Sequence, residues 1–182
     1  MISFKAKYIG PATVQKLNTK NEFKDYKVSA VEFEQGSEAD KRVLSSLHEN
    51  WGFGDYYSRD IFYSYMAQSH FPNSHKYQRY IALTLQASDF DHPKSDDILG
   101  VMEITKGISD VNQITFIQIK PEYMKNNLNR IIKGVGTELL KVAEKLMPKG
   151  DIKLNAHNSA IEFYESNGYT LINNYKIMIK KR

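Results

Sequence analysis

The residues with the clearest chemical use are two glycines, Gly134 and Gly136, which stand directly before an amphipathic helical pattern. Glycine has no Cβ, so a ligand can approach its backbone closely. The unpaired N–H groups of a first helical turn point outward and lie at the positive end of the helix dipole. This spacing therefore predicts an anion site, with phosphate as the natural ligand.

Three other interpretations of the glycine pair can be weighed on the residues alone. A dinucleotide-binding turn needs a third glycine, and Leu139 occupies that position. A nucleotide-binding P-loop needs a Gly-Lys pair followed by Ser or Thr, which occurs nowhere in the chain. An ordinary helix start is the remaining alternative, because glycine is also common at helix entries.

The elements around the glycines can be predicted from periodicity and from turn residues. Residues 113–119 are rich in β-branched and aromatic types and precede Pro121, which indicates a strand. The helix after Gly136 should end at Pro148 and Gly150. Short strands are expected at residues 151–154, 169–172 and 176–181, and a short helix is expected between an Asn158 N-cap and a left-handed Gly168.

Three segments in this order, residues 118–123, 133–140 and 158–169, resemble the GNAT family of acyl-CoA N-acyltransferases. The resemblance covers roughly residues 97–182. It implies a single α/β (α+β) domain, with a mixed, mostly antiparallel twisted sheet of about seven strands and helices on both faces. Residues 1–96 would form the acceptor-side half of the domain, and residues 97–182 would form the half that binds acetyl-CoA, the expected co-substrate.

The resemblance also assigns roles to individual residues. Three strand residues would pair their backbone with the pantetheine arm, and the N–H of the first would polarise the thioester carbonyl: Ile117, Gln118 and Ile119. The glycine turn would supply N–H groups to the pyrophosphate from Lys133, Gly134, Val135, Gly136 and Thr137. Asn158 would contact the coenzyme, and Tyr164 would protonate the departing thiolate.

One departure from the family pattern lies beside the predicted phosphate site. The family usually has Gln or Arg three positions before the first glycine, where this chain has Ile131, and Arg130 is one step out of register. Residues 124–133 also make a longer approach to the glycines than is usual. We expect binding to be intact, because both glycines and the following helix are in place.

Transfer of an acyl group to a neutral amine needs an oxyanion donor, an acid for sulfur and a means of removing one proton. Tyr164 suits the acid, because a phenol can donate to a thiolate. Glu103, in a probable central strand at residues 98–105, is the favoured base. His48, Glu49 and Asp55 are competing bases acting through water. Gln113, at the start of the cofactor strand, cannot act as a base because it carries an amide.

Composition excludes several classes of function. The chain has no cysteine, which excludes a thiol intermediate, a disulfide or a thiolate metal site. Its five histidines show no ligand spacing, so we expect no metal. No nucleophile elbow of the Gly-x-Ser-x-Gly kind is present. The absence of a long apolar run or a signal-peptide pattern predicts a cytoplasmic protein without a membrane partner.

Acceptor choice should lie in the first half of the chain. Strands are predicted at residues 2–8, 13–17, 25–34 and 77–86, helices at 39–50 and 59–69, and a polar loop at 87–97. Residues 49–58 form a loop with the only Trp, and its Asp55 or Glu49 would favour a small cationic amine. A protein amine, a charged tRNA or a catalytically degenerate coenzyme-binding protein are the alternatives. The net charge of +4 is too mild to predict nucleic-acid binding, and a homodimer is allowed.

Overall fold

The fold was analysed in a computed structural model, which describes residues 6–51, 57–71, 77–86, 93–106, 112–172 and 175–182. Strands in the first half are β1 (Lys7–Leu17), β2 (Phe23–Phe33), β3 (Gln78–Thr84) and β4 (Ile98–Thr105). Strands in the second half are β5 (Asn112–Ile119), β6 (Ile132–Lys133), β7 (Ile152–Asn155), β8 (Thr170–Leu171) and β9 (Ile177–Lys180). Helices are α1 (Glu38–Asn50), α2 (Ser58–His70), α4 (Val135–Leu146) and α5 (Ile161–Ser166), and 3-10 turns are η1 (Ser95–Asp97), η2 (Pro121–Tyr123) and η3 (Asn158–Ala160).

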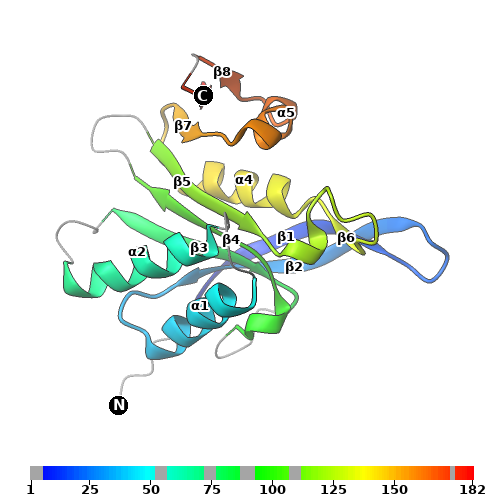
Figure 1. Cartoon of the computed structure of the whole chain (residues 1–182), viewed down its shortest axis with the longest axis horizontal. Coiled ribbons are helices and arrows are strands. Elements are labelled where there is room, and N and C mark those ends of the chain that lie inside the picture. Colours follow the sequence, from blue (N-terminus) through cyan, green and yellow to red (C-terminus); the bar gives the residue numbers. More distant parts are fainter. Residues whose placement is uncertain (1–5, 52–56, 72–76, 87–92, 107–111, 173–174) are drawn as a thin grey trace.

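The strands of the described residues form one sheet in the order β6-β1-β2-β3-β4-β5-β7-β9-β8. Neighbouring strands are antiparallel except β5 and β7, which are parallel and are joined through α4. Figure 1 shows α1 and α2 beside each other on one side of the sheet and α4 on the opposite side. The predicted mixed, mostly antiparallel sheet with helices on both faces is confirmed. The described residues form nine strands where about seven are expected, and two of the nine, β6 and β8, have only two residues each.

The two faces of the sheet carry separate cores because side chains alternate along each strand. One core packs Leu139 and Leu140 of α4 against strand residues such as Leu83 and Met102. The other packs Leu44 of α1 and further side chains of α1 and α2 against the opposite face. Gly100 lets α4 lie close to β4, because a Cβ at that position would come within 2.9 Å of Val135 Cγ1.

The first strand is longer than the sequence predicts. The sequence predicts two strands divided by Gly10 and Pro11, whereas β1 continues through both residues, with an irregular register between Tyr8 and Gly10. Pro11 is tolerated because β1 has a strand on only one side there, since β6 pairs only with Gln15 and Lys16. Residues 1–5 lie outside the described part of the chain.

The helices of the first half confirm their predicted positions within one residue. Ser37 caps α1 by accepting a hydrogen bond from the Asp40 N–H at 3.2 Å. Trp51 follows α1 and is buried in the core against α1 and α2. Among the described helices, none has the length and apolar character that crossing a bilayer requires.

Burial of tyrosines gives the fold a defined response to alkaline pH. Tyr65 is 2% exposed, and burial, with Asp40 nearby, raises the pKa of its phenol. A native state that holds this proton more tightly than the unfolded chain keeps its full stability below about pH 10, the ordinary tyrosine pKa, and loses it above.

We therefore expect the free energy of unfolding to fall above about pH 10, by ~1.4 kcal/mol per pH unit for each tyrosine that stays protonated. Urea denaturation between pH 8 and 11 measures this slope. Tyr65→Phe should make the slope shallower, whereas substitution of Tyr175, which is 82% exposed, should leave it unchanged. Equal slopes for wild type and Tyr65→Phe would contradict the assignment.

Candidate active site

The site begins where two strands part. The parallel pairing of β5 with β7 runs from Asn112 to Ile114 and ends there, while β5 continues to Ile119 along β4. A β-bulge lies at the same point, because Glu103 faces Phe116 and Ile104 faces Ile114, which leaves Thr115 as the extra residue. Thr115 Oγ1 lies 3.1 Å from Thr105 Oγ1, a hydrogen bond that holds the bulge to β4. A bulge bends its strand, and here β5 turns away from β7.

Beyond the bulge, one edge of β5 has backbone groups that pair with no strand of the described residues. Lys120 donates its N–H to the Leu99 carbonyl at 3.0 Å. The alternation of an antiparallel pair then directs the Gln118 backbone to β4 and the N–H groups of Ile117 and Ile119 to the opposite side. Both residues line the cavity described next. The predicted use of this strand by a ligand therefore has the required backbone geometry at Ile117 and Ile119.

A cavity of about 700 Å³, here called the β5 cavity, fills the space between the parted strands. Its lining comes from the start of α2, the end of β5, the start of α4 and the segment from β7 to α5. The residues are Tyr57, Arg59, Asp60, Ile117, Gln118, Ile119, Met124, Gly136, Asn155, His157, Ser159, Ala160, Phe163 and Tyr164. Four separate stretches of the sequence thus meet at one site.

Gln118 acts here through its side chain as well as its backbone. It is 5% exposed, and its Oε1 accepts a hydrogen bond from the Tyr57 N–H at 3.2 Å. Its Nε2 donates to the Ile119 carbonyl at 2.7 Å. The amide therefore connects the start of α2 to the end of β5 and fixes the width of the cavity at this point.

The two glycines that led to the phosphate prediction do different things. Gly134 adopts the left-handed region at φ +83° directly before α4, and space is open around it. Gly136 instead makes room for a side chain of the protein, because a Cβ there would lie 2.8 Å from Phe163 Cζ. The start of α4 is therefore exposed at Gly134 and is covered by α5 at Gly136.

Tyr164 is placed by the end of α5. The N–H of Gly168, at φ +83°, bonds to the Glu165 carbonyl, and the Tyr169 N–H bonds to the Tyr164 carbonyl at 3.1 Å. This is a Schellman motif, and its usual apolar contact is the packing of the Tyr164 and Tyr169 rings with centroids 5.9 Å apart. The predicted left-handed Gly168 is confirmed.

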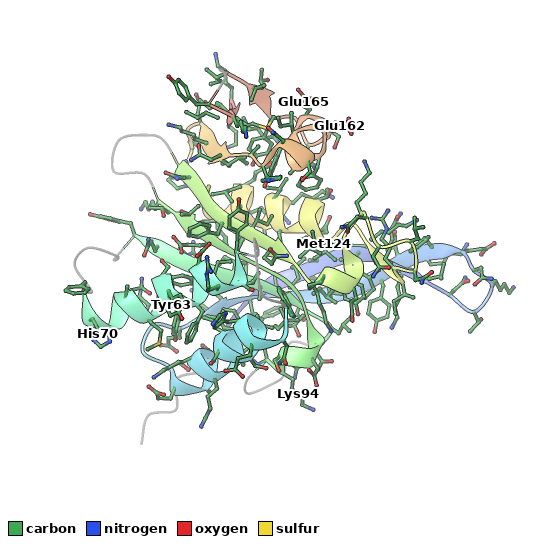
Figure 2. All side chains as sticks on the ribbon, viewed as in Figure 1. Tyr63, His70, Lys94, Met124, Glu162 and Glu165 are labelled. Carbon is green, nitrogen blue, oxygen red and sulfur yellow. The ribbon has the colours of Figure 1, made fainter. Side chains whose placement is uncertain are left out.

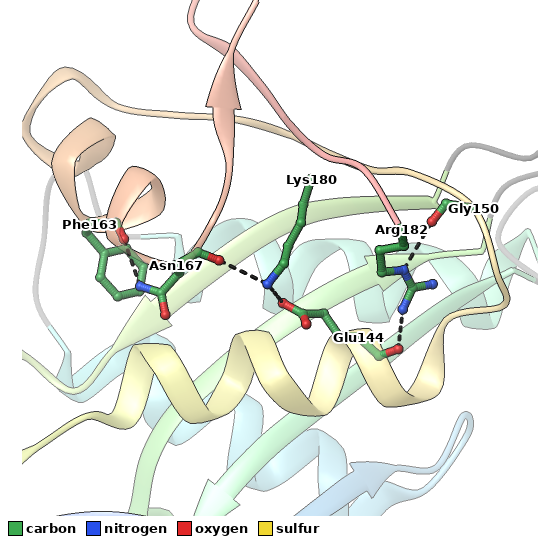
Figure 3. A network of polar contacts seen from close by, with 6 residues as sticks. All are labelled: Glu144, Gly150, Phe163, Asn167, Lys180 and Arg182. Carbon is green, nitrogen blue, oxygen red and sulfur yellow. Dashed lines mark hydrogen bonds and ion pairs between the residues drawn. The ribbon is translucent and has the colours of Figure 1, made fainter.

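A polar network holds α5 against α4 (Figure 3). Lys180 Nζ forms an ion pair with Glu144 Oε1 at 2.7 Å and donates to the Asn167 carbonyl at 2.9 Å. Asn167 Nδ2 donates in turn to the Phe163 carbonyl at 2.7 Å. Glu162 and Glu165 of α5 are exposed and are not part of this network (Figure 2).

The phenol of Tyr164 has the environment of a neutral proton donor. The residue is 5% exposed, and burial, with Tyr57 nearby, raises the pKa of the phenol above its ordinary value. Tyr164 also lines a smaller cavity of about 220 Å³, whose walls include Phe116 and Leu154. The residue therefore stands between two hollow spaces and keeps its proton at neutral pH.

The other predicted catalytic residue lies elsewhere. Glu103 is fully buried in β4, where Gln78 Nε2 donates to its Oε1 at 3.1 Å. It does not line the β5 cavity. The structure therefore does not bring Glu103 and Tyr164 into one cavity, and a role for Glu103 as base requires a chain of waters.

The segment before α5 corrects the predicted helix start. Asn158 does not cap a continuous helix, because His157 precedes the turn η3 and its Nδ1 accepts from the Ser159 N–H at 3.4 Å. Asn158 is exposed and is not among the residues lining the cavity, whereas its neighbours His157 and Ser159 are. Asn155 also lines the cavity, and only its place at the end of a strand could have indicated this.

The remaining predicted residues lie apart from the lining of the β5 cavity or outside the described part of the chain. Lys133, Gly134, Val135 and Thr137 surround the start of α4 without lining the β5 cavity. The competing base Asp55 lies outside the described residues, and Glu49 bonds to Ser45 on the surface of α1. Among the described charged side chains, Arg59 and Asp60 are those that line the cavity. No group of three or more His, Asp or Glu side chains in the described ranges could hold a metal ion.

Comparison with known proteins gives similar folds at low identity. No family model and no curated protein matches the chain. Among solved structures, the PaiA N-acetyltransferase of Thermoplasma acidophilum in complex with coenzyme A is 18% identical, covers 85% of this chain and 99% of its own, and has a TM-score of 0.49. An acetyltransferase of the GNAT family from Desulfovibrio desulfuricans is 13% identical over 82% of this chain and 96% of its own, with a TM-score of 0.49.

The chain resembles GNAT acetyltransferases. AtaTR bound with AcCoA is a further similar structure, 14% identical over 71% of this chain and 83% of its own, with a TM-score of 0.46.

The contact between Gly136 and Phe163 can be tested by mutation. Gly136→Ala should destabilise the protein by about 1–3 kcal/mol, because the new methyl group overlaps the Phe163 ring. Phe163→Leu in the same chain should recover part of that loss, since the shorter side chain leaves room. Urea denaturation of both single variants and the double variant measures the coupling, and strictly additive effects would contradict the contact.

Proposed function

We propose that this chain is an acetyl-CoA-dependent N-acetyltransferase that moves an acetyl group directly from the thioester to an amine. The observation that carries the proposal is the free edge of β5 at Ile117 and Ile119, which faces a cavity shared with Tyr164. A pantetheine arm contains two amides and can pair with such an edge as an added strand does.

The residues present fit coenzyme A in three respects. The cavity of about 700 Å³ is large enough for a small-molecule ligand. The start of α4 at Gly134 presents unpaired N–H groups to a pyrophosphate without a side-chain cap. Gly134, Val135, Gly136 and Thr137 would supply these donors, whereas the pairing of β6 with β1 directs the predicted Lys133 N–H to Gln15. Asn158 would contact the coenzyme from the exposed side of η3.

The co-substrate supplies an acetyl group activated as a thioester. The N–H of Ile117 would hold the carbonyl oxygen and stabilise the negative charge that develops on it. Tyr164 would donate its phenolic proton to the sulfur. The phenol is protonated at neutral pH, as a donor must be, and burial raises its pKa, which makes it a weaker acid toward the thiolate than an exposed tyrosine.

We propose a small cationic amine as the acceptor. The boundary of the cavity nearest α2 contains Tyr57, whose ring packs on Phe116, and the carboxylate of Asp60. Arg59 Nε lies 3.4 Å from Asp60 Oδ1, a partly exposed ion pair that a cationic amine would have to displace. A cation is stabilised by both aromatic faces and carboxylates. Asp60 takes the place that the sequence suggested for Asp55, while Glu103 as base is a proposal that Glu103→Gln tests through the pH dependence of kcat.

Calorimetry with acetyl-CoA tests the first step of the proposal. We expect saturable one-to-one binding, because the edge of β5 and the start of α4 together offer several backbone donors. If millimolar acetyl-CoA gave no heat of binding, the proposed function would be contradicted.

Tyr164→Phe separates an enzyme from a catalytically inactive coenzyme-binding protein. Loss of the phenol should lower kcat by about 10²-fold or more, the usual effect of a general acid, while the Kd for acetyl-CoA stays within about twofold. Tyr169→Phe is the matched control, because its ring packs on Tyr164 but it does not line the cavity. Wild-type turnover in Tyr164→Phe would contradict the assigned role.

A further inference from the structure

A second cavity lies beside the start of α4, within the segment that departs from the family pattern. Its volume is about 400 Å³. Three of its lining residues are cations, Lys125, Arg130 and Lys133, and none of the described residues that line it is acidic. We call it the insertion cavity, because residues 124–133 form most of its wall together with Leu17 and Phe23.

The insertion is held in place by backbone bonds. Its turns are closed by bonds from the Asn127 N–H to the Met124 carbonyl and from the Arg130 N–H to the Asn127 carbonyl. Leu17 donates its N–H to the Ile131 carbonyl at 2.8 Å, and β6 then pairs with β1. The cations therefore stand on a segment that is tied to the sheet.

The charges of the cavity are available to a ligand. Within the described residues, neither Arg130 nor Lys133 forms an ion pair. Lys133 Nζ lies 3.5 Å above the Phe23 ring, which holds the ammonium group at the wall of the cavity. Lys125 lies 3.9 Å from Glu162, but both side chains are mostly exposed, so this pair is weak and easily exchanged.

The insertion cavity and the β5 cavity are lined by residues that are neighbours in the sequence on both sides of the approach to α4. Met124 lines the β5 cavity and Lys125 lines the insertion cavity. At the end of the insertion, Lys133 lines the insertion cavity and Gly136 lines the β5 cavity. Gly134 lies between Lys133 and Gly136 in the sequence, so a long ligand bound at the N–H groups at the start of α4 has one cavity on each side of it.

From this arrangement we infer that the insertion cavity binds the nucleotide end of coenzyme A, with Lys125, Arg130 and Lys133 recognising its 3′-phosphate. The inference rests on the proposed function. A phosphate monoester carries a charge close to −2 at neutral pH and has three acceptor oxygens, so it requires several cations and no nearby acid. The insertion thus supplies positive charge beside a position where the family usually has Gln or Arg and this chain has Ile131.

Calorimetry with coenzyme A and with 3′-dephospho-coenzyme A tests the inference without any turnover. Wild type should bind coenzyme A at least about tenfold more tightly, the factor that a charge-assisted contact provides. Arg130→Gln combined with Lys125→Gln should reduce this preference to within about twofold, by weakening coenzyme A while leaving the dephospho form unchanged. Lys145→Gln combined with Lys149→Gln removes the same two positive charges at positions that do not line this cavity, and it should leave the preference intact.

The possible results separate the two proposals. If neither coenzyme binds, the acetyltransferase function fails. If both bind equally to wild type, or if the double variant keeps the wild-type preference, the function stands and the assignment of the insertion cavity is wrong. Thermal melting of each variant in the absence of ligand checks that the fold is intact, and Lys133→Gln provides an independent variant from β6.

Discussion

The break in strand pairing at Thr115 is the constraint on which the rest of the site depends. A strand inside a sheet normally satisfies its backbone groups on both sides, and leaving them unpaired in a buried position is costly. The bulge, held by the Thr105 and Thr115 hydroxyls, ends the pairing of β5 with β7 at Ile114. The N–H groups of Ile117 and Ile119 then face a cavity, where a ligand or water must satisfy them.

The opposite wall is set by contacts between segments far apart in the sequence. Gly136 leaves room for the Phe163 ring, and the Schellman motif at Gly168 orients Tyr164. Lys180 connects the end of α5 to Glu144 of α4. None of these contacts makes a functional site alone. Together they place the buried phenol of Tyr164 in the cavity that the free edge of β5 also lines, and they pack α5 against α4.

Local patterns predicted the elements well, because they depend on periodicity and turn chemistry. The glycine turn before α4, the left-handed Gly168 and the alternation of the sheet follow from residue type alone. The continuity of β1 through Pro11 was missed, since pairing with β2 overrides the local turn signal. The cavity lining at Asn155 and the separation of Glu103 from Tyr164 could not be predicted, because no residue pattern marks the bulge that parts the strands.

Amide hydrogen exchange of β5, followed by NMR with and without acetyl-CoA, tests the central claim most directly. Because the Gln118 N–H is already bonded within the sheet, its exchange should be the same in both states. The amides of Ile117 and Ile119 should exchange at least about tenfold more slowly once the coenzyme is bound. Binding of acetyl-CoA with no change at Ile117 and Ile119 would contradict the claim that the free edge of β5 is the binding surface.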